Sequence, residues 1–494
     1  MNTPRRHRQN KGRHVGRPNR SGASPASSRS KPDQLGTPKS TPRNTRAIAA
    51  QVVQEVYNGA FASTALDYAL KNSGLDVRDR SLLTELVYGT LRWAAALEVA
   101  IKRGSDKPSK KLDKKMRPHL LVAAYQLQHL DDRIPSHAVV GEAVANIKKV
   151  RPGLQGFANA LLRNLGPALH VLLRKNTSSQ HVALAYGFSE ELASLFHGFI
   201  DDSEWQEALA AMNERPALAL RLLDEDCDEE KFLADLEKKG KFAEPHTFVP
   251  RAFLVAGAGA VPLLPGFSEG RFLVQDPASQ LVSLLAKVKP GEHVLDLCAA
   301  PGTKTISLAR DTGVRGSVLA VDVDEKRACR IQENVERALP SRCGKIDVLV
   351  KDARELAHDS ELANSFDVIL LDAPCSALGT VRRHPEVKLR RTKEDIEKSC
   401  LLQAELLDAA VPLLKPGGTL VYAVCSPLPQ EGREQITAFL DRFPAFQIEA
   451  ANEALSYVPQ DAVNDKGCLQ LYPHRHQCDA FFAARLIFGV PKPV

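Results

Sequence analysis

The sequence predicts a multidomain protein in which an all-α bundle precedes a doubly wound α/β domain. Two observations carry this prediction. Apolar residues recur at i, i+3 and i+4 through residues 44–166, without the alternation typical of strands. From residue 269 onward, short apolar runs alternate with helical patterns, as in a parallel sheet covered by helices. We therefore expect four parts: a disordered basic tail at 1–43, the helical domain at 44–166, a small α/β connector at 167–268 and the α/β domain at 269–494.

The composition limits where the protein acts and what it binds. The chain is 44% hydrophobic, yet it has no uninterrupted apolar stretch of about 18 residues and no apolar signal-peptide core. We therefore expect a cytoplasmic protein with no membrane partner. The nine cysteines begin at Cys227 and show neither a C-x-x-C pair nor the spacing of a zinc site. This pattern predicts reduced thiols and no bound metal.

The positive charge is concentrated in the N-terminal tail. Residues 1–43 hold eleven Lys and Arg against Asp33 alone, a net charge of +10, whereas the whole chain carries +7. The tail lacks large apolar side chains and cannot repay the entropy of ordering. Such an arm attracts nucleic-acid phosphates without reading sequence. The alternative is a solubilising tail with no partner.

The helical domain shows apolar stripes at helical spacing. One stripe contains Ala49, Val52, Val53 and Val56, and another contains Leu82, Leu83, Leu86, Val87 and Leu91. The pattern predicts a compact bundle of about five to seven helices. A basic run at residues 107–117 either follows an RNA backbone or is a solvated face.

Three segments of this domain resemble the NusB-type helical RNA-binding domain. They are RSLLTELVYGTLRW (80–93), RIPSHAVVGEAV (133–144) and GFANALLRNL (156–165). The resemblance implies a helical module that binds RNA.

The connector combines helical and strand patterns. We expect helices at 189–199, 205–213 and 225–241, and a strand at 217–224. In the α/β domain, strands are predicted at 317–321, 348–350, 368–371 and 419–424, and helices at 325–338 and 393–414. Asp322, Asp352, Asp372 and Cys425 then lie at or just past strand ends, on the edge where such sheets bind ligands.

A strand, a turn and a helix at residues 294–305 form the motif VLDLCAAPGTKT. The strand Val294–Leu297 leads into a turn with Pro301 and Gly302, and a helix starts near Lys304. This order presents backbone N–H groups to a nucleotide-like ligand, and Asp322 follows at the distance of a ribose-binding carboxylate. The motif is neither G-x-G-x-x-G nor a Walker loop, so NAD binding and nucleotide hydrolysis are both weakly supported.

Two cysteines follow strand ends in the motifs FDVILLDAPCSALG (366–379) and TLVYAVCSPLPQE (419–431). Cys375 and Cys425 should therefore both face the predicted ligand edge, with Asp372 beside them. A thiol in a polar cleft can have a lowered pKa, which makes it a nucleophile at neutral pH.

Together these motifs resemble the RNA (cytosine-5)-methyltransferases of the RsmB/Sun type, within the NOL1/NOP2/Sun family. The resemblance covers residues 44 to 490 and implies a Rossmann-like methyltransferase domain that forms 5-methylcytidine in RNA. It also implies S-adenosyl-L-methionine as the cofactor. The residues implied to hold this cofactor are Cys298, Ala299, Ala300, Pro301, Gly302, Thr303, Lys304, Asp322, Asp352 and Asp372.

The resemblance further implies Cys425 as the nucleophile and Cys375 as the thiol that helps release the product. Lys304 and Asp372 complete the catalytic set, and a protonated Asp372 would lie against N3 of the cytosine and stabilise the charge shifted onto the ring. The base must be unpaired or flipped out to reach the site. Flanking phosphates are predicted to contact Arg382, Arg383, His384 and Lys388.

The helical first domain favours 16S rRNA as the substrate, bound by a monomer. Transfer RNA is an alternative substrate for the same chemistry. A non-catalytic RNA-binding assembly factor is the alternative outside enzymes; it predicts loss of Cys425, Asp372 or Lys304, and all three are present.

Overall fold

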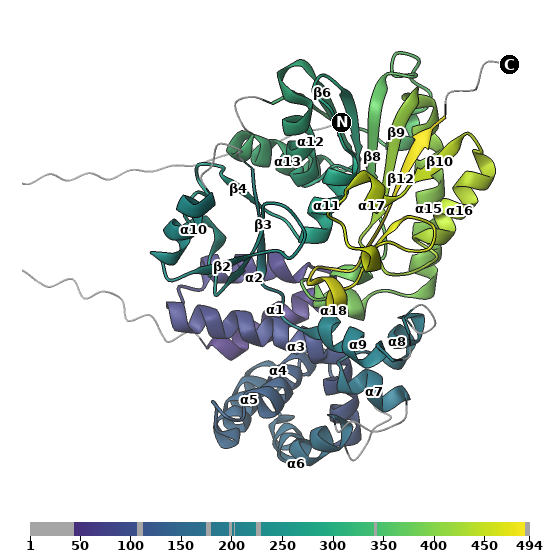
Figure 1. Cartoon of the computed structure of the whole chain (residues 1–494). Helices are drawn as coiled ribbons and strands as arrows, with labels where there is room; N and C mark the ends of the chain where they lie inside the picture. The colour runs from purple at the N-terminus through teal and green to yellow at the C-terminus, as the bar shows by residue number, and fades with distance from the viewer. Residues whose placement is uncertain are drawn as a thin grey trace, which may run out of the picture. The chain divides into compact units, whose positions relative to one another are not determined.

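The computed structural model describes residues 44–105, 112–173, 179–196, 200–201, 203–223, 229–339 and 343–489, shown in Figure 1. The predicted basic tail at 1–43 and residues 107–111 of the basic run lie outside the described residues. Residues 44–494 form one compact unit. No helix among the described residues is long and apolar enough to cross a membrane.

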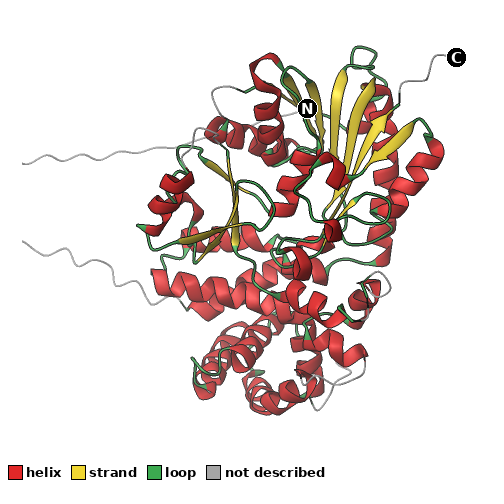
Figure 2. Ribbon diagram, viewed as in Figure 1, coloured by secondary structure: helices red, strands yellow, loops and turns green. Residues whose placement is uncertain are grey.

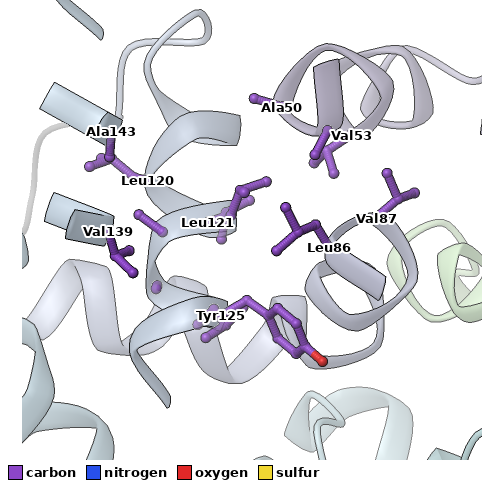
Figure 3. Close-up of a cluster of buried hydrophobic side chains, with 14 of the residues drawn as sticks. Ala50, Val53, Leu86, Val87, Leu120, Leu121, Tyr125, Val139 and Ala143 are labelled. Atoms are coloured by element: carbon purple, nitrogen blue, oxygen red, sulfur yellow. The ribbon is translucent and has the colours of Figure 1, made fainter. Parts of the chain in front are cut away.

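The helical domain contains six helices within the described residues, as the apolar periodicity predicted. They are α1 (Thr45–Tyr57), α2 (Ala62–Asn72), α3 (Val77–Arg103), α4 (Arg117–His129), α5 (Ser136–Val150) and α6 (Gln155–Leu173). Asn44 and Asp76 cap α1 and α3 by accepting hydrogen bonds from backbone N–H groups of the first turn. Figure 3 shows Val53 and Leu86, one from each apolar stripe, packed with Leu121 of α4. Their burial stabilises the bundle, since the shorter helices are marginal alone.

Three short helices and a small sheet follow the bundle. The helices are α7 (Ser179–Ala185), α8 (Glu190–Phe196) and α9 (Trp205–Asn213). The sheet has the order β2–β3–β1–β4 and is antiparallel throughout. The four strands are β1 (Leu218–Leu222), β2 (Phe242–Pro245), β3 (Ala252–Ala256) and β4 (Phe272–Val274). The helix α10 (Glu229–Glu237) and the 3₁₀ turn η1 (Val261–Leu263) lie between them in the sequence.

The α/β domain is built on a second sheet with the order β10–β12–β9–β8–β5–β6–β7, and β11 pairs with β12. The strands are β5 (His293–Leu297), β6 (Ser317–Asp322), β7 (Lys345–Val350), β8 (Phe366–Asp372), β9 (Leu414–Val424), β10 (Phe446–Glu449), β11 (Leu469–Leu471) and β12 (Phe481–Phe488). The five strands β7, β6, β5, β8 and β9 are parallel, as predicted. The strands β12 and β10 are antiparallel, so the sheet is mixed at that edge.

Helices cover both faces of this sheet (Figure 2). They are α11 (Pro277–Leu285), α12 (Thr303–Thr312), α13 (Glu325–Ala338), α14 (Ala353–Leu356), α15 (Lys393–Ala410), α16 (Arg433–Arg442), α17 (Ala451–Ala454) and α18 (Pro473–His476), with the 3₁₀ turns η2 (Gly313–Arg315), η3 (Leu378–Thr380), η4 (Pro385–Leu389), η5 (Val411–Leu413) and η6 (Gln460–Ala462). Neighbouring strand residues enter different cores: Leu370 packs with α11 and α12, whereas Leu371 packs with α15 and α16. This period of two explains why the central strands are apolar throughout.

Two predicted domain boundaries differ from the elements of the structure. The boundary at 166 falls within α6, which runs to Leu173, and the boundary at 268 separates β4 from the small sheet to which it belongs. The physical reason is that β4 is short and pairs with β1, which lies far back in the sequence. A local pattern does not reveal that partner.

Candidate active site at the carboxyl edge of the large sheet

The register of the parallel strands aligns the predicted site residues. Leu297 of β5 pairs with Val321 of β6 and with Leu371 of β8, so the next residues, Cys298, Asp322 and Asp372, share one row. Asp372 in turn pairs with Ala423 of β9, two residues before Cys425. The sheet therefore brings together side chains from four strands at its carboxyl edge, as the sequence predicted.

The turn between β5 and α12 has a backbone suited to holding a ligand. Cys298 and Gly302 both have positive φ, 61° and 94°. A Cβ on Gly302 would lie 2.9 Å from the side chain of Ile331, so only glycine fits there. No side chain of the described residues caps α12 at Gly302, which leaves the first N–H groups of the helix available to an anionic group.

Asp322 stands beside this turn with its carboxyl group fixed and buried. Its Oδ2 accepts from the N–H of Ala300 (3.2 Å), and Oδ1 accepts from the N–H of Asp324 (3.1 Å). A carboxylate at a strand end next to an uncapped helix fits a cofactor that carries both ribose hydroxyls and a carboxylate.

Lys304 and Asp372 form a close ion pair, with 2.6 Å between Nζ and Oδ2. Burial lowers the pKa of Lys304, but the charge of Asp372 and the hydrogen bond to it outweigh burial, so the pKa is raised overall. Lys304 is therefore protonated. That Asp372 carries a proton and lies against N3 of the base stays a prediction.

Cys375 and Cys425 lie in contact, with 3.4 Å between their sulfur atoms. The hydrogen bond with Cys425 and burial raise the pKa of Cys375 well above its usual value. Cys375 therefore keeps its proton and can donate it to Cys425 Sγ. Both thiols are free of disulfides.

A buried hydrogen-bond network joins the two thiol loops, and sequence reasoning did not identify it. Glu431 Oε1 accepts from the Ser376 N–H (2.6 Å), and Oε2 accepts from Ser376 Oγ (2.5 Å). Ser376 Oγ lies 3.2 Å from Ser426 Oγ, and Gln403 donates to Glu431 as well (3.3 Å). The sequence offered one signal for this network, because a Ser follows the Cys in both motifs. The residues around Glu431 in the sequence do not distinguish it from an acidic residue exposed to solvent.

Backbone hydrogen bonds of Gly379 also join the Cys375 loop to neighbouring segments. Its N–H donates to Cys425 O (3.0 Å), and its carbonyl accepts from the N–H of Ala480 (3.1 Å). A Cβ on Gly379 would lie 1.9 Å from Ala480 O, so a larger residue would separate the two loops.

Two of the cations predicted to contact RNA phosphates have other roles in the structure. Lys388 is buried, and its Nζ donates to Arg92 O, Gly187 O and Asn213 Oδ1 at 2.7, 3.0 and 2.7 Å. With three protein acceptors, its ammonium has no donor left for a phosphate. Arg383 pairs with the buried carboxylates of Asp276 (2.7 Å) and Asp479 (3.0 Å). These two predictions are corrected, because the cations join segments of the protein.

Arg382 and His384 are partly exposed. Arg382 donates to Cys478 O (3.1 Å), and the side chain of His384 is 42% exposed. Asp352 caps α14 and pairs with Arg354 at 2.6 Å. Its contact with a cofactor stays a prediction. Within the described ranges, no group of three or more His, Cys, Asp or Glu side chains could hold a metal ion.

Comparisons with known protein families match the helical domain, the region of the small sheet and the α/β domain. Residues 283–487 match the family model of the 16S rRNA methyltransferases RsmB/F. Residues 43–166 match the NusB family, and residues 201–262 match the ferredoxin-like domain of RsmF/B-like methyltransferases.

Curated relatives and solved structures agree with these matches. The ribosomal RNA small subunit methyltransferase B of Salmonella newport is 37% identical over 447 residues, which is 90% of this chain and 98% of the relative. The protein of that name from Salmonella heidelberg is 36% identical over 445 residues, with the same coverage. The crystal structure of PH0851 superposes with a TM-score of 0.74 at 25% identity, over 90% of this chain and 98% of that one. A methyltransferase homolog from Pyrococcus horikoshii gives a TM-score of 0.52 at 26% identity, over 63% and 99%.

Proposed function

Because the chain belongs to the RsmB/F family of S-adenosylmethionine-dependent RNA methyltransferases, we propose that it methylates carbon 5 of a cytosine in 16S rRNA through a covalent adduct with Cys425. Two observations carry this proposal. Two free thiols lie 3.4 Å apart, and Lys304 and Asp372 form an ion pair at the same edge of the sheet.

S-adenosylmethionine supplies an electrophilic methyl group on a sulfonium centre. The N–H groups at the start of α12 would hold its carboxylate, and Asp322 would accept hydrogen bonds from its ribose hydroxyls. Asp352 remains a further candidate from the next strand end.

Cys425 acts first. Carbon 5 of cytosine is a weak nucleophile until a group adds to carbon 6, and the thiolate of Cys425 makes that bond. The Cys375 S–H donates toward Cys425 Sγ, and this hydrogen bond stabilises a thiolate before attack. The charge of Lys304 also acts on Cys425.

The Lys304–Asp372 pair supplies the proton that N3 of the cytosine ring accepts. As Cys425 adds to carbon 6, electron density moves to N3, and the pair delivers its proton there from Lys304 Nζ. Carbon 5 would then take the methyl group. Its proton would pass to water, the C–H electrons would form the double bond to carbon 6, and the bond between Cys425 Sγ and carbon 6 would break to return the Cys425 thiolate. N3 would give its proton back to the Lys304–Asp372 pair, and Cys375, beside the breaking bond, would assist this release.

The test is methyl transfer from labelled S-adenosylmethionine to protein-free 16S rRNA, with wild type, Cys425→Ala and Cys375→Ala. We expect labelled 5-methylcytidine with wild type, none with Cys425→Ala, and a trapped protein–RNA adduct with Cys375→Ala. Labelling that survives Cys425→Ala would show that another group is the nucleophile. If wild type labels transfer RNA and not 16S rRNA, the chemistry stands and the substrate is wrong.

A further inference from the structure

The segment directly after the Cys375 loop, residues 382–391, is held by the helical domain. We call it the strap; it contains η4. Arg92 of α3 donates from Nη2 to Arg382 O (2.9 Å), and its own carbonyl accepts from Lys388 Nζ (2.7 Å). These two hydrogen bonds run in opposite directions between α3 and the strap. Arg92 of α3 therefore holds the strap at two of its residues, Arg382 and Lys388.

Lys388 extends this attachment to the short helices. Its ammonium also binds Gly187 O and Asn213 Oδ1, and it lies 4.3 Å from the ring centroid of Phe188. Every one of these partners is neutral, and burial lowers the pKa of Lys388 well below its usual value. A buried cation without a carboxylate is costly. Its three acceptors come from segments far apart in the sequence, which indicates that it joins them.

Two further charged side chains of the strap bind helix ends of matching polarity. Glu386 Oε1 accepts from the N–H of Ala62, the first residue of α2 (3.0 Å). Arg390 Nη2 donates to Val56 O (2.6 Å) and to Ala60 O, at the end of α1. A carboxylate at a helix N-terminus and a guanidinium at a C-terminus are both favourable with the helix dipole. The strap therefore complements the helical domain in charge as well as in hydrogen bonds.

The other end of the strap reaches the catalytic loop. Arg391 Nε donates to Ser376 O (2.8 Å), and Ser376 directly follows Cys375. The Ser376 side chain is held by Glu431 in turn. Hydrogen bonds thus join α1 and α3 to the strap, and join the strap to the residue next to Cys375.

We propose that the helical domain positions the Cys375 loop through this strap, with Lys388 and Arg390 as positioning residues. The domain then has a second task besides binding RNA. The inference rests on the proposed role of Cys375 in product release. When the strap loses its hold on α1, Arg391 is no longer fixed, so the bond that Arg391 makes to Ser376 O no longer holds that residue in place, and Cys375 moves relative to the bond between Cys425 and carbon 6.

The test compares Arg390→Met with Lys393→Met in the full chain. Arg390 and Lys393 line the same groove between the two domains, but Lys393 is exposed and starts α15, so its replacement removes one positive charge and leaves the strap intact. Cys375→Ala is the reference for a trapped adduct. Three quantities are measured on 16S rRNA: kcat, KM and the fraction of protein in a denaturant-resistant RNA adduct.

We expect Arg390→Met to lower kcat by about 10- to 100-fold, as a misplaced catalytic group does. KM should change by less than about twofold, and adduct should accumulate as in Cys375→Ala. Lys393→Met should behave as wild type. Arg390→Lys keeps the positive charge and one hydrogen bond, so it should recover part of the lost kcat. If thermal melting shows that Arg390→Met is unfolded, Arg390→Lys takes its place in the comparison with Lys393→Met.

Three outcomes would overturn the inference. Equal losses in Arg390→Met and Lys393→Met would mean that positive charge in the groove only binds RNA. No adduct in a folded Arg390 variant, beside clear adduct in Cys375→Ala, would mean that the strap does not position the loop. No adduct in Cys375→Ala itself would show that the proposed role of Cys375 is wrong, and the inference would fall with it.

Discussion

Replacing Glu431 by Ala should separate the two thiol loops and weaken the fold. The carboxyl group is fully buried and accepts from the N–H of Ser376, from Ser376 Oγ and from Gln403 Nε2. A buried donor left without a partner costs about 1–3 kcal/mol, so three donors that partly relax give about 3–6 kcal/mol. That is a large share of a domain's stability, which is about 5–15 kcal/mol.

The assay is urea unfolding followed by far-UV circular dichroism, combined with kcat for RNA methylation. Glu431→Ala should lower the free energy of unfolding by the amount given above and reduce kcat by about 100-fold, since the loss of Ser376 anchoring displaces Cys375. Glu431→Gln, which keeps one acceptor oxygen for the Ser376 N–H, should lose less. Exposed Glu434, three residues along, is the control, and its replacement by Ala should cost less than about 1 kcal/mol.

A Glu431→Ala protein that unfolds within about 1 kcal/mol of wild type and turns over normally would refute this reasoning. The network would then be incidental to the site, and the separation of the thiols would depend on the backbone bonds of Gly379 alone.

Three further predictions address single groups. Burial raises the pKa of Asp296 from 3.8 to about 7. Between pH 3.8 and about 7, the native protein therefore keeps a proton on Asp296 that the unfolded chain loses, so the free energy of unfolding falls as pH rises. Its slope is up to about 1.4 kcal/mol per pH unit, and urea unfolding across this range should show a flatter profile for Asp296→Asn; equal slopes would contradict the assignment. Gly379→Ala should cost about 3 kcal/mol, because its Cβ meets Ala480 O, whereas Gly141→Ala, with open space around it, should be neutral or stabilising in the same assay. Lys304→Met should reduce methylation by about 100- to 10,000-fold at an unchanged RNA Kd, and a variant that keeps wild-type kcat would remove Lys304 from the proton transfer.

The sequence by itself determined the elements and the chemical groups at the strand ends. Strands and helices have local periods, so a run such as residues 325–338 predicts its own helix, and α13 has those bounds. In a parallel sheet, the carboxyl ends of strands share one edge. Positions of Asp322, Asp372 and Cys425 therefore followed from local patterns alone.

Only the tertiary structure decided what each charge contacts. Lys388 and Arg383 belong to a basic stretch that predicted phosphate contacts, yet their partners are Arg92, Gly187, Asp276 and others from distant segments. Glu431 likewise acquires its role from Ser376, fifty-five residues earlier in the chain. A local pattern records a side chain's own chemistry, but the free energy of a charge depends on burial and on partners that folding brings from elsewhere.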